Sequence, residues 1–196
     1  MAYQYFAIYK PYGTLSQFTP EGNKPGLGSH YKFPIDCYPI GRLDTDSEGL
    51  LLLTNDKRVN SLLLDPENKH ERVYLVQVDG QVNEDALSKL RNGISINAAG
   101  NNYKTLRAKA EMIEEPVLPP RNPPVRFRKN IPTSWIELTL QEGKNRQVRH
   151  MTAAVGFPTL RLVRNSIEQI SLDKMQPADV RQFSQAEFYS LLKLKQ

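Results

Sequence analysis

The chain has 196 residues, of which 39% are hydrophobic and 24% are charged, and its formal net charge is +5. This composition is typical of a folded globular protein and excludes an intrinsically disordered chain. No apolar run approaches the roughly 20 residues of a membrane-spanning helix, and the N-terminus lacks the apolar core of an export signal. The single cysteine, Cys37, excludes an internal disulfide, so we expect a packed thiol in the reducing cytoplasm.

The positive charge is concentrated in one part of the chain. Residues 121–164 include nine Lys or Arg and two Glu, a net charge of +7, whereas the remainder has 17 basic and 19 acidic residues. A basic stripe of this kind favours binding to a phosphate backbone, although an ordinary solvated face can have the same composition. The charge pattern therefore indicates a nucleic acid as the partner.

Two strands and a long loop are predicted in the N-terminal part. Residues 5–9 are predicted to form a strand that ends at KPYG, and residues 50–54 are predicted to form a buried strand. Between them, residues 14–33 contain three glycines and two prolines, which favours a loop. Asn55 is predicted to cap a short helix that ends before Pro66.

The middle of the chain alternates between apolar and polar residues, which is the pattern of half-buried strands. Residues 72–79, RVYLVQVD, form the clearest example, and residues 106–112 and 136–140 are predicted as two further strands. Asn83 is predicted to cap an intervening helix, EDALSKLRN, and Gly93 to end it.

A proline-rich basic segment, residues 114–132, precedes the last of these strands. Its prolines hold the chain extended and remove N–H donors that a sheet would need, so we expect a stiff surface loop. This loop would present four cations, Arg121, Arg126, Arg128 and Lys129.

The sequence RQVRHMTAAV is predicted to form a helix with two different faces. Asn145 is its expected cap and Gly156 its terminator. At about 100° per residue, the apolar side chains fall on one face, while Arg146, Arg149 and His150 fall on the opposite one. One side of the helix would therefore pack, and the other would offer cations to an anion.

Strands and short helices follow one another without the regular alternation of parallel α/β proteins, and the final segment, SQAEFYSLLKLKQ, is predicted to be an amphipathic helix. We therefore expect an α+β fold with a mixed, largely antiparallel central sheet flanked by helices and loops. No linker separates independent domains, so residues 1–196 are expected to form a single domain.

Few catalytic arrangements fit the sequence. Metal-ligand spacings, phosphate-loop and dinucleotide fingerprints and the GxSxG elbow are all absent, so we expect no metal and no cofactor. The turn GRLDTDSEGL, residues 41–50, instead places Asp44 two residues after Arg42. That carboxylate could be an ionised nucleophile, a structural ion pair that braces the turn, or half of a glycosidase pair with Asp46 or Glu48.

Three motifs occur in the chain in the order GRLDTDSEGLLLLTND, RVYLVQVDG and EGKNRQVRHM, between KPYG near the start and FPTLRLVRNSI. They resemble the motifs of pseudouridine synthases of the RsuA family, and RNPPVRFRKNIPTSW, joined to EGKNRQVRHMTAAVGFPTLRLVR, resembles its large-subunit rRNA enzymes in particular. The resemblance implies the pseudouridine synthase catalytic fold, with two lobes that share a sheet. It also implies isomerisation of a uridine in ribosomal RNA, which we expect to be 23S rRNA.

The resemblance assigns roles to five residues. Asp44 would attack a flipped uridine, Tyr74 would stack on it and could help to remove the proton from carbon 5, and Arg149 would keep the carboxylate ionised. Leu160 would pack against the target base, and Arg42 would help to fill the space that the extruded nucleotide leaves.

Further expectations concern RNA binding. Arg146, Arg126 and Arg128 are expected to contact RNA, and the basic segment becomes more important because we expect no N-terminal S4 domain of the kind that many relatives carry. Many relatives have lysine where this chain has Arg72.

We expect a cytoplasmic monomer without a membrane partner. The alternatives are a non-catalytic RNA-binding or ribosome-assembly module on the same fold, and a glycosidase-like hydrolase.

Overall fold

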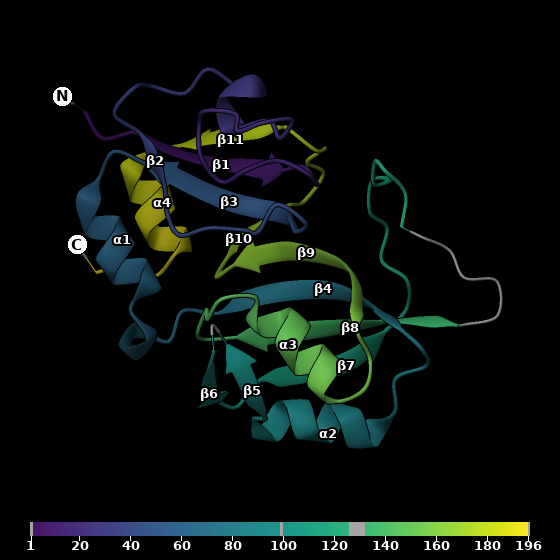
Figure 1. Ribbon diagram of the computed structural model, residues 1–196. Coiled ribbons are helices and arrows are strands. Elements are labelled where there is room, and N and C mark those ends of the chain that lie inside the picture. The colour runs from purple at the N-terminus through teal and green to yellow at the C-terminus, as the bar shows by residue number, and fades with distance from the viewer. Residues whose placement is uncertain (1, 99, 126–131, 196) are drawn as a thin grey trace. The chain divides into compact units, whose positions relative to one another are not determined.

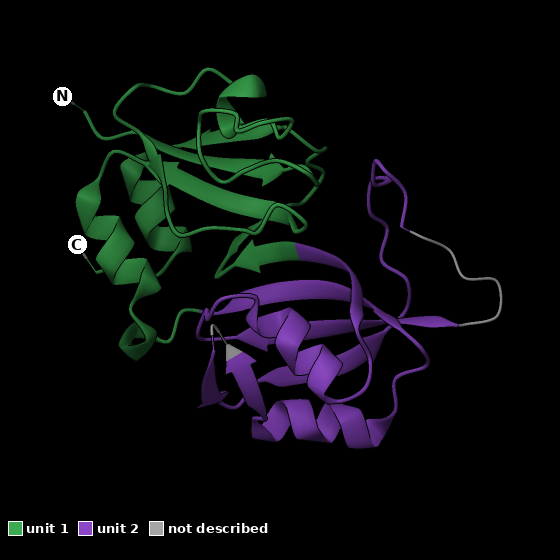
Figure 2. Ribbon diagram, in the orientation of Figure 1, with its two compact units in different colours: residues 1–70, 164–196 green, residues 71–163 purple. Residues whose placement is uncertain are grey.

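The structure, a computed structural model, describes residues 2–98, 100–125 and 132–195. The chain divides into two compact units (Figures 1 and 2), of which unit 1 comprises residues 1–70 and 164–196 and unit 2 comprises residues 71–163. The boundary falls inside strand β9 (Thr159–Ile167), which therefore begins in unit 2 and ends in unit 1.

The sheet of unit 1 is built around β1 (Tyr5–Lys10). This strand pairs in antiparallel fashion with β3 (Glu48–Thr54) on one side and with β11 (Val180–Phe183) on the other. The short β2 (Tyr38–Pro39) pairs with β3, and β10 (Ile170–Ser171) pairs with the end of β9. Every residue of β1 and β3 is buried, so both faces of this sheet are covered.

Different parts of unit 1 cover the two faces. On one face the ring of Tyr5 packs against Phe188 of helix α4 (Gln185–Leu191), with ring centroids 4.8 Å apart. On the other face, strand residues pack against Leu27 of the long loop and against Cys37, which follows that loop. Cys37 is buried in this cluster, as predicted for a packed thiol, and burial raises its pKa.

The sheet of unit 2 has β8 (Thr133–Leu140) between β4 (Arg72–Asp79) and β7 (Lys109–Ile113), and both pairings are antiparallel. Helices α2 (Glu84–Asn92) and α3 (Gln147–Ala154) lie against this sheet in Figure 1, and residues of all five elements share one hydrophobic core. No helix in the described part of the chain is long and apolar enough to cross a membrane.

The predicted α+β class with a largely antiparallel sheet is confirmed. The strand predicted over residues 106–112 is wrong at its start, because β7 begins at Lys109 and Leu106 is 48% exposed. Met112 is also exposed, and among the described residues no strand pairs with the outer side of β7. A short hairpin of β5 (Ser95–Ala98) and β6 (Asn101–Lys104) adds to the predicted elements.

The cap predicted for the helix after β3 is wrong by one residue. Helix α1 (Lys57–Leu64) is capped by Asp56, whose side chain accepts the backbone N–H of Arg58 at 3.2 Å, rather than by Asn55. The predicted Asn83 cap of α2 is confirmed, because its side chain accepts a backbone N–H three residues further on at 2.9 Å.

Candidate functional site

The predicted site residues are divided between the two units. Unit 1 contains Asp44 and Arg42. Arg126 and Arg128 lie outside the described residues, so their RNA contacts stay a prediction. Unit 2 contains the four remaining residues, Tyr74, Arg146, Arg149 and Leu160.

Asp44 lies in a short turn that leads into β3. The backbone N–H of Ser47 closes the turn by donating to the Asp44 carbonyl oxygen at 3.0 Å. Asp44 is half-buried and Arg42 is exposed. Gly49, at the end of the turn, has φ +111°, and a Cβ there would lie 2.4 Å from the carbonyl oxygen of Arg164. Only glycine fits this position, because the backbone of β9 approaches it so closely.

A second segment of unit 1, residues 13–16, holds the turn on both sides of Asp44. The Ser16 hydroxyl donates to the Leu43 carbonyl oxygen at 2.7 Å and accepts the Leu43 backbone N–H at 3.0 Å. The backbone N–H of Gly13 donates to the Thr45 carbonyl oxygen at 2.8 Å. These contacts were not predicted, since the sequence shows residues 14–33 only as a loop.

Lys10, the last residue of β1, is fully buried beside these two segments. Its Nζ donates to the carbonyl oxygens of Pro11 at 3.0 Å and Thr14 at 2.7 Å. Burial lowers the pKa of Lys10 to about 7, although the carboxylates of Glu48 and Asp44 act in the opposite direction. The charge of Lys10 is therefore coupled to the carboxylates of the Asp44 turn.

In unit 2, Tyr74 and the apolar face of α3 share one core. Tyr74 is only 8% exposed and belongs to the same cluster as Val148 and Met151. On the other side of the helix, Arg146 is exposed and Arg149 is half-buried. The predicted packing face of this helix is confirmed, whereas Arg146 lies just before the helix and the role of the cations stays a prediction.

The predicted Asn145 cap of α3 is wrong. The capping position is occupied by Arg146 in the left-handed conformation, with φ 49°, and its side chain makes no capping hydrogen bond. The first residue of the helix, Gln147, organises the preceding turn instead. Its Oε1 accepts the Lys144 backbone N–H at 2.9 Å, and its Nε2 donates to Glu142 at 2.6 Å.

Glu142 is a buried acceptor that ties α3 to other parts of unit 2. Besides Gln147, it accepts the Tyr103 hydroxyl and the Leu106 backbone N–H, the latter at 2.8 Å. The hydrogen bond to Glu142, together with burial, raises the pKa of Tyr103 to about 12. The sequence analysis counted Glu142 only as a negative charge within the basic segment, so its structural role was missed. The one feature that could have indicated this role is its position as the first residue of the EGKNRQVRHM motif.

Contacts between α3 and the start of β9 bring Arg149 next to Thr159, the residue that precedes Leu160. Nη1 of Arg149 donates to the Thr159 carbonyl oxygen at 3.5 Å. The hydroxyl groups of Thr152 and Thr159 are also hydrogen-bonded, at 2.7 Å. Leu160 is the next residue in β9 and is half-buried. Two residues that the resemblance assigns to the site thus lie at one junction within unit 2.

The basic segment does not present all its cations to solvent, contrary to the single surface stripe that its composition suggested. Arg161 is buried, and its Nη2 donates to the Pro119 carbonyl oxygen at 2.8 Å. Arg164 is also buried, and its Nε donates to the Leu50 carbonyl oxygen at 2.7 Å. These two arginines satisfy backbone carbonyl groups, so the charge available to an RNA is smaller than the count over residues 121–164 implies.

Comparison with known proteins identifies the class. The family model described as RNA pseudouridylate synthase matches residues 4–154, and the chain belongs to this family. A solved structure described as a pseudouridylate synthase covers 97% of this chain and 74% of its own, with a TM-score of 0.78 at 26% identity. The predicted pseudouridine synthase fold is therefore confirmed.

Curated relatives show which members of the family this chain is similar to. The protein named ribosomal large subunit pseudouridine synthase E from Vibrio parahaemolyticus is 51% identical, over 86% of this chain and 68% of the relative. Its counterpart of the same name from Xanthomonas axonopodis is 47% identical, over 87% of this chain and 88% of the relative. The predicted resemblance to the large-subunit rRNA enzymes of the family, which came from residues 121–135 and 142–164, is confirmed by these names.

Proposed function

We propose that this chain isomerises one uridine of the large-subunit 23S rRNA to pseudouridine. The observation that carries the proposal is the family match over residues 4–154, together with relatives at 45–51% identity that are named ribosomal large subunit pseudouridine synthase E. The excess of basic residues in the segment 121–164 supports an RNA partner. We propose further that the two units act as one catalytic domain, in a cytoplasmic monomer.

The reaction needs no external reactant, because the product is an isomer of the substrate. The bond from C1′ of the ribose to N1 of uracil breaks, the base rotates, C1′ joins C5, and the C5 proton is lost while N1 gains one. Three routes are open for the first step, namely attack on the sugar, attack on the base and a glycal route. Each of them requires a carboxylate in that first step. We assign that role to Asp44, which lies in a turn held in place from both sides.

The other assignments follow the motifs of the family. Tyr74 would stack on the base and assist removal of the C5 proton, and Arg149 would keep the nucleophile ionised. Leu160 would pack against the base, and Arg42 would fill the vacated place in the RNA. Flipping a nucleotide costs a few kcal/mol of stacking. Contacts from Arg146, and from Arg126 and Arg128 in the basic loop, would offset that cost.

The substitution Asp44→Asn tests the proposal. The assay measures tritium released from uridine labelled at C5, in rRNA isolated from cells that lack the gene. We expect the variant to lose at least about 10³-fold in rate, because no other group replaces the nucleophile. Asp85→Asn is the matched control, since Asp85 is an exposed carboxylate on α2 and its loss should leave the rate unchanged.

Each other outcome has a defined meaning. Pseudouridine formation by Asp44→Asn would show that the nucleophile is a different residue. Tight rRNA binding by the wild-type chain without any product would favour an RNA-binding or ribosome-assembly module. Release of free uracil would indicate a hydrolase. Mapping pseudouridine across rRNA from cells with and without the gene would identify the target uridine.

A further inference from the structure

Asp44 is flanked by two residues that are both hydrogen-bonded to the same neighbouring segment. Leu43 exchanges two hydrogen bonds with the Ser16 hydroxyl, at 2.7 and 3.0 Å. Thr45 accepts the Gly13 backbone N–H at 2.8 Å. Because these partners lie immediately before and after Asp44, the Asp44 backbone cannot shift without stretching at least one of these contacts.

The segment that holds Asp44 is anchored independently of the Asp44 turn. The Thr14 hydroxyl is hydrogen-bonded to Nε2 of His30 at 2.9 Å, and the Leu15 backbone N–H donates to Pro25 at 2.9 Å. The buried Nζ of Lys10 binds the carbonyl oxygen of Thr14. The 13–16 segment is therefore a fixed support, to which the Asp44 turn is attached.

Ser16 is the part of this attachment that a substitution can remove. The contact between Gly13 and Thr45 joins two backbones, whereas both contacts to Leu43 pass through the Ser16 side chain. Ser16 is half-buried, so water can replace its hydroxyl, and the buried Leu43 side chain keeps the turn attached to the core. Loss of the hydroxyl should therefore loosen residues 43 and 44 without unfolding the chain.

We propose that Ser16 is a positioning residue that sets the orientation of the Asp44 carboxylate, an inference that rests on the proposed role of Asp44 as the nucleophile. A carboxylate that attacks a flipped uridine must lie close to the reacting atom in the correct direction. A displacement of about 1 Å in such a group costs up to roughly 100-fold in rate. Ser16 acts through the backbone of Leu43 and does not itself need to touch the RNA.

Kinetics of three variants test the proposal on the same labelled rRNA. For Ser16→Ala we expect kcat to fall by about 10-fold to 100-fold with KM within about two-fold, because positioning acts on the chemical step. Ser16→Thr keeps the hydroxyl and should restore kcat to within about three-fold of wild type. Thr19→Ala is the control, because Thr19 is exposed in the same loop, and we expect wild-type kinetics.

Folding and RNA binding are measured separately. Thermal unfolding gives the folded fraction of Ser16→Ala at the assay temperature, and we expect it to be complete. In the Asp44→Asn background, adding Ser16→Ala should leave the Kd for rRNA within about two-fold, because the hydroxyl does not contribute to binding. Such a result separates positioning from general stability.

Four results would decide against the inference or its basis. A kcat for Ser16→Ala within two-fold of wild type, with Asp44→Asn inactive, would overturn the role of Ser16 and leave the proposed function intact. A loss of kcat in proportion to the unfolded fraction, or equal losses in Ser16→Ala and Ser16→Thr, would also overturn it. Activity of Asp44→Asn would instead refute the nucleophile assignment, whatever Ser16→Ala does.

Discussion

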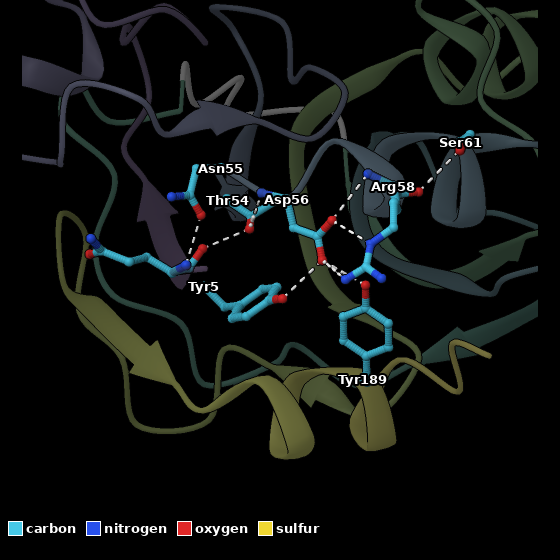
Figure 3. Close-up of polar contacts among 8 residues, drawn as sticks. Tyr5, Thr54, Asn55, Asp56, Arg58, Ser61 and Tyr189 are labelled. Atoms are coloured by element: carbon cyan, nitrogen blue, oxygen red, sulfur yellow. Dashed lines mark hydrogen bonds and ion pairs between the residues drawn. The ribbon is translucent and has the colours of Figure 1, made fainter. Parts of the chain in front are cut away.

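The hydroxyl of Tyr189 donates to Oδ2 of Asp56 at 2.7 Å, although the two residues are 133 positions apart (Figure 3). The same oxygen accepts the Tyr5 hydroxyl and Nη2 of Arg58, both at 2.9 Å. One fully buried carboxylate therefore joins β1, α1 and α4 within unit 1. The hydrogen bonds from Arg58, with smaller contributions from the two tyrosines, hold the pKa of Asp56 well below its usual range.

This depressed pKa predicts how unit 1 responds to acid. A carboxyl group with a lower pKa in the folded state stabilises the fold above its unfolded pKa, and this stability is lost as the pH falls through the folded pKa. Asp56→Asn should lower the free energy of unfolding at pH 7 by about 3 kcal/mol, and its stability should fall less than that of wild type below about pH 4. Urea unfolding between pH 7 and pH 2 measures both effects. Parallel curves for the two proteins would contradict the assignment, and Asp85→Asn is the exposed control.

The close approach at Gly49 predicts a large loss of stability on adding a methyl group. Gly49→Ala combines φ +111° with a Cβ placed 2.4 Å from the Arg164 carbonyl oxygen. We expect it to lower the free energy of unfolding by about 3 kcal/mol or more in guanidinium chloride titrations. Gly22→Ala is the matched control, since Gly22 also has positive φ, +56°, but nothing lies within 4 Å of its Cβ. That control should lower the free energy of unfolding by only about 1 kcal/mol. Equal losses in the two variants would mean that the positive φ alone, and not the contact with Arg164, causes the loss of stability.

The hydrogen bond between Tyr103 and Glu142 predicts an unusual tyrosine titration. The Tyr103 hydroxyl has its pKa raised to about 12, so its contribution to stability is complete below pH 10 and is lost as the pH rises towards 12. The ultraviolet difference between wild type and Tyr103→Phe isolates this group among the nine tyrosines. In Glu142→Gln, the Tyr103 signal should move towards the ordinary value of about 10. An unchanged titration would show that Glu142 does not control this hydroxyl.

Salt dependence tests whether the basic loop contacts RNA. The double substitution Arg126→Glu with Arg128→Glu should weaken rRNA binding and reduce the slope of log Kd against log salt by about 1 to 2, because fewer counterions are released. Filter binding between low and moderate salt measures the slope. Lys89→Glu, an exposed charge reversal on α2, is the control. A slope that matches wild type would place the loop away from the RNA.

Segments whose burial repeats with a regular period could be predicted accurately from the sequence. The strand predicted over residues 72–79 has those bounds in β4, and the helix between Asn83 and Gly93 has the predicted ends. In both cases the alternation or the capping residue is encoded in a few adjacent positions. The three motifs, of which the first contains Asp44, also led to the correct family, because their order and spacing can be recognised in the sequence without a structure.

Features that depend on partners distant in the chain could not be predicted. The helix start at Asn145 was wrong because Gln147 and Glu142 organise that turn through Tyr103 and Leu106, which precede it by about 40 residues. The basic stripe over residues 121–164 was wrong where it includes Arg161, because the guanidinium of this buried residue binds a backbone carbonyl group at Pro119. No local pattern indicates which buried polar groups will meet.

The amino-acid sequence by itself determined the periodic strands and helices, the excess of cations near the third motif, and the family. These properties depend on the type and spacing of nearby residues, which fix local conformation and which faces are apolar. Only the tertiary structure decided that Ser16 holds the backbone before Asp44, that Asp56 joins three elements and that Glu142 anchors α3. The physical reason is that a buried polar group must find a hydrogen-bonding partner wherever the folded chain supplies one, and that partner is set by three-dimensional proximity.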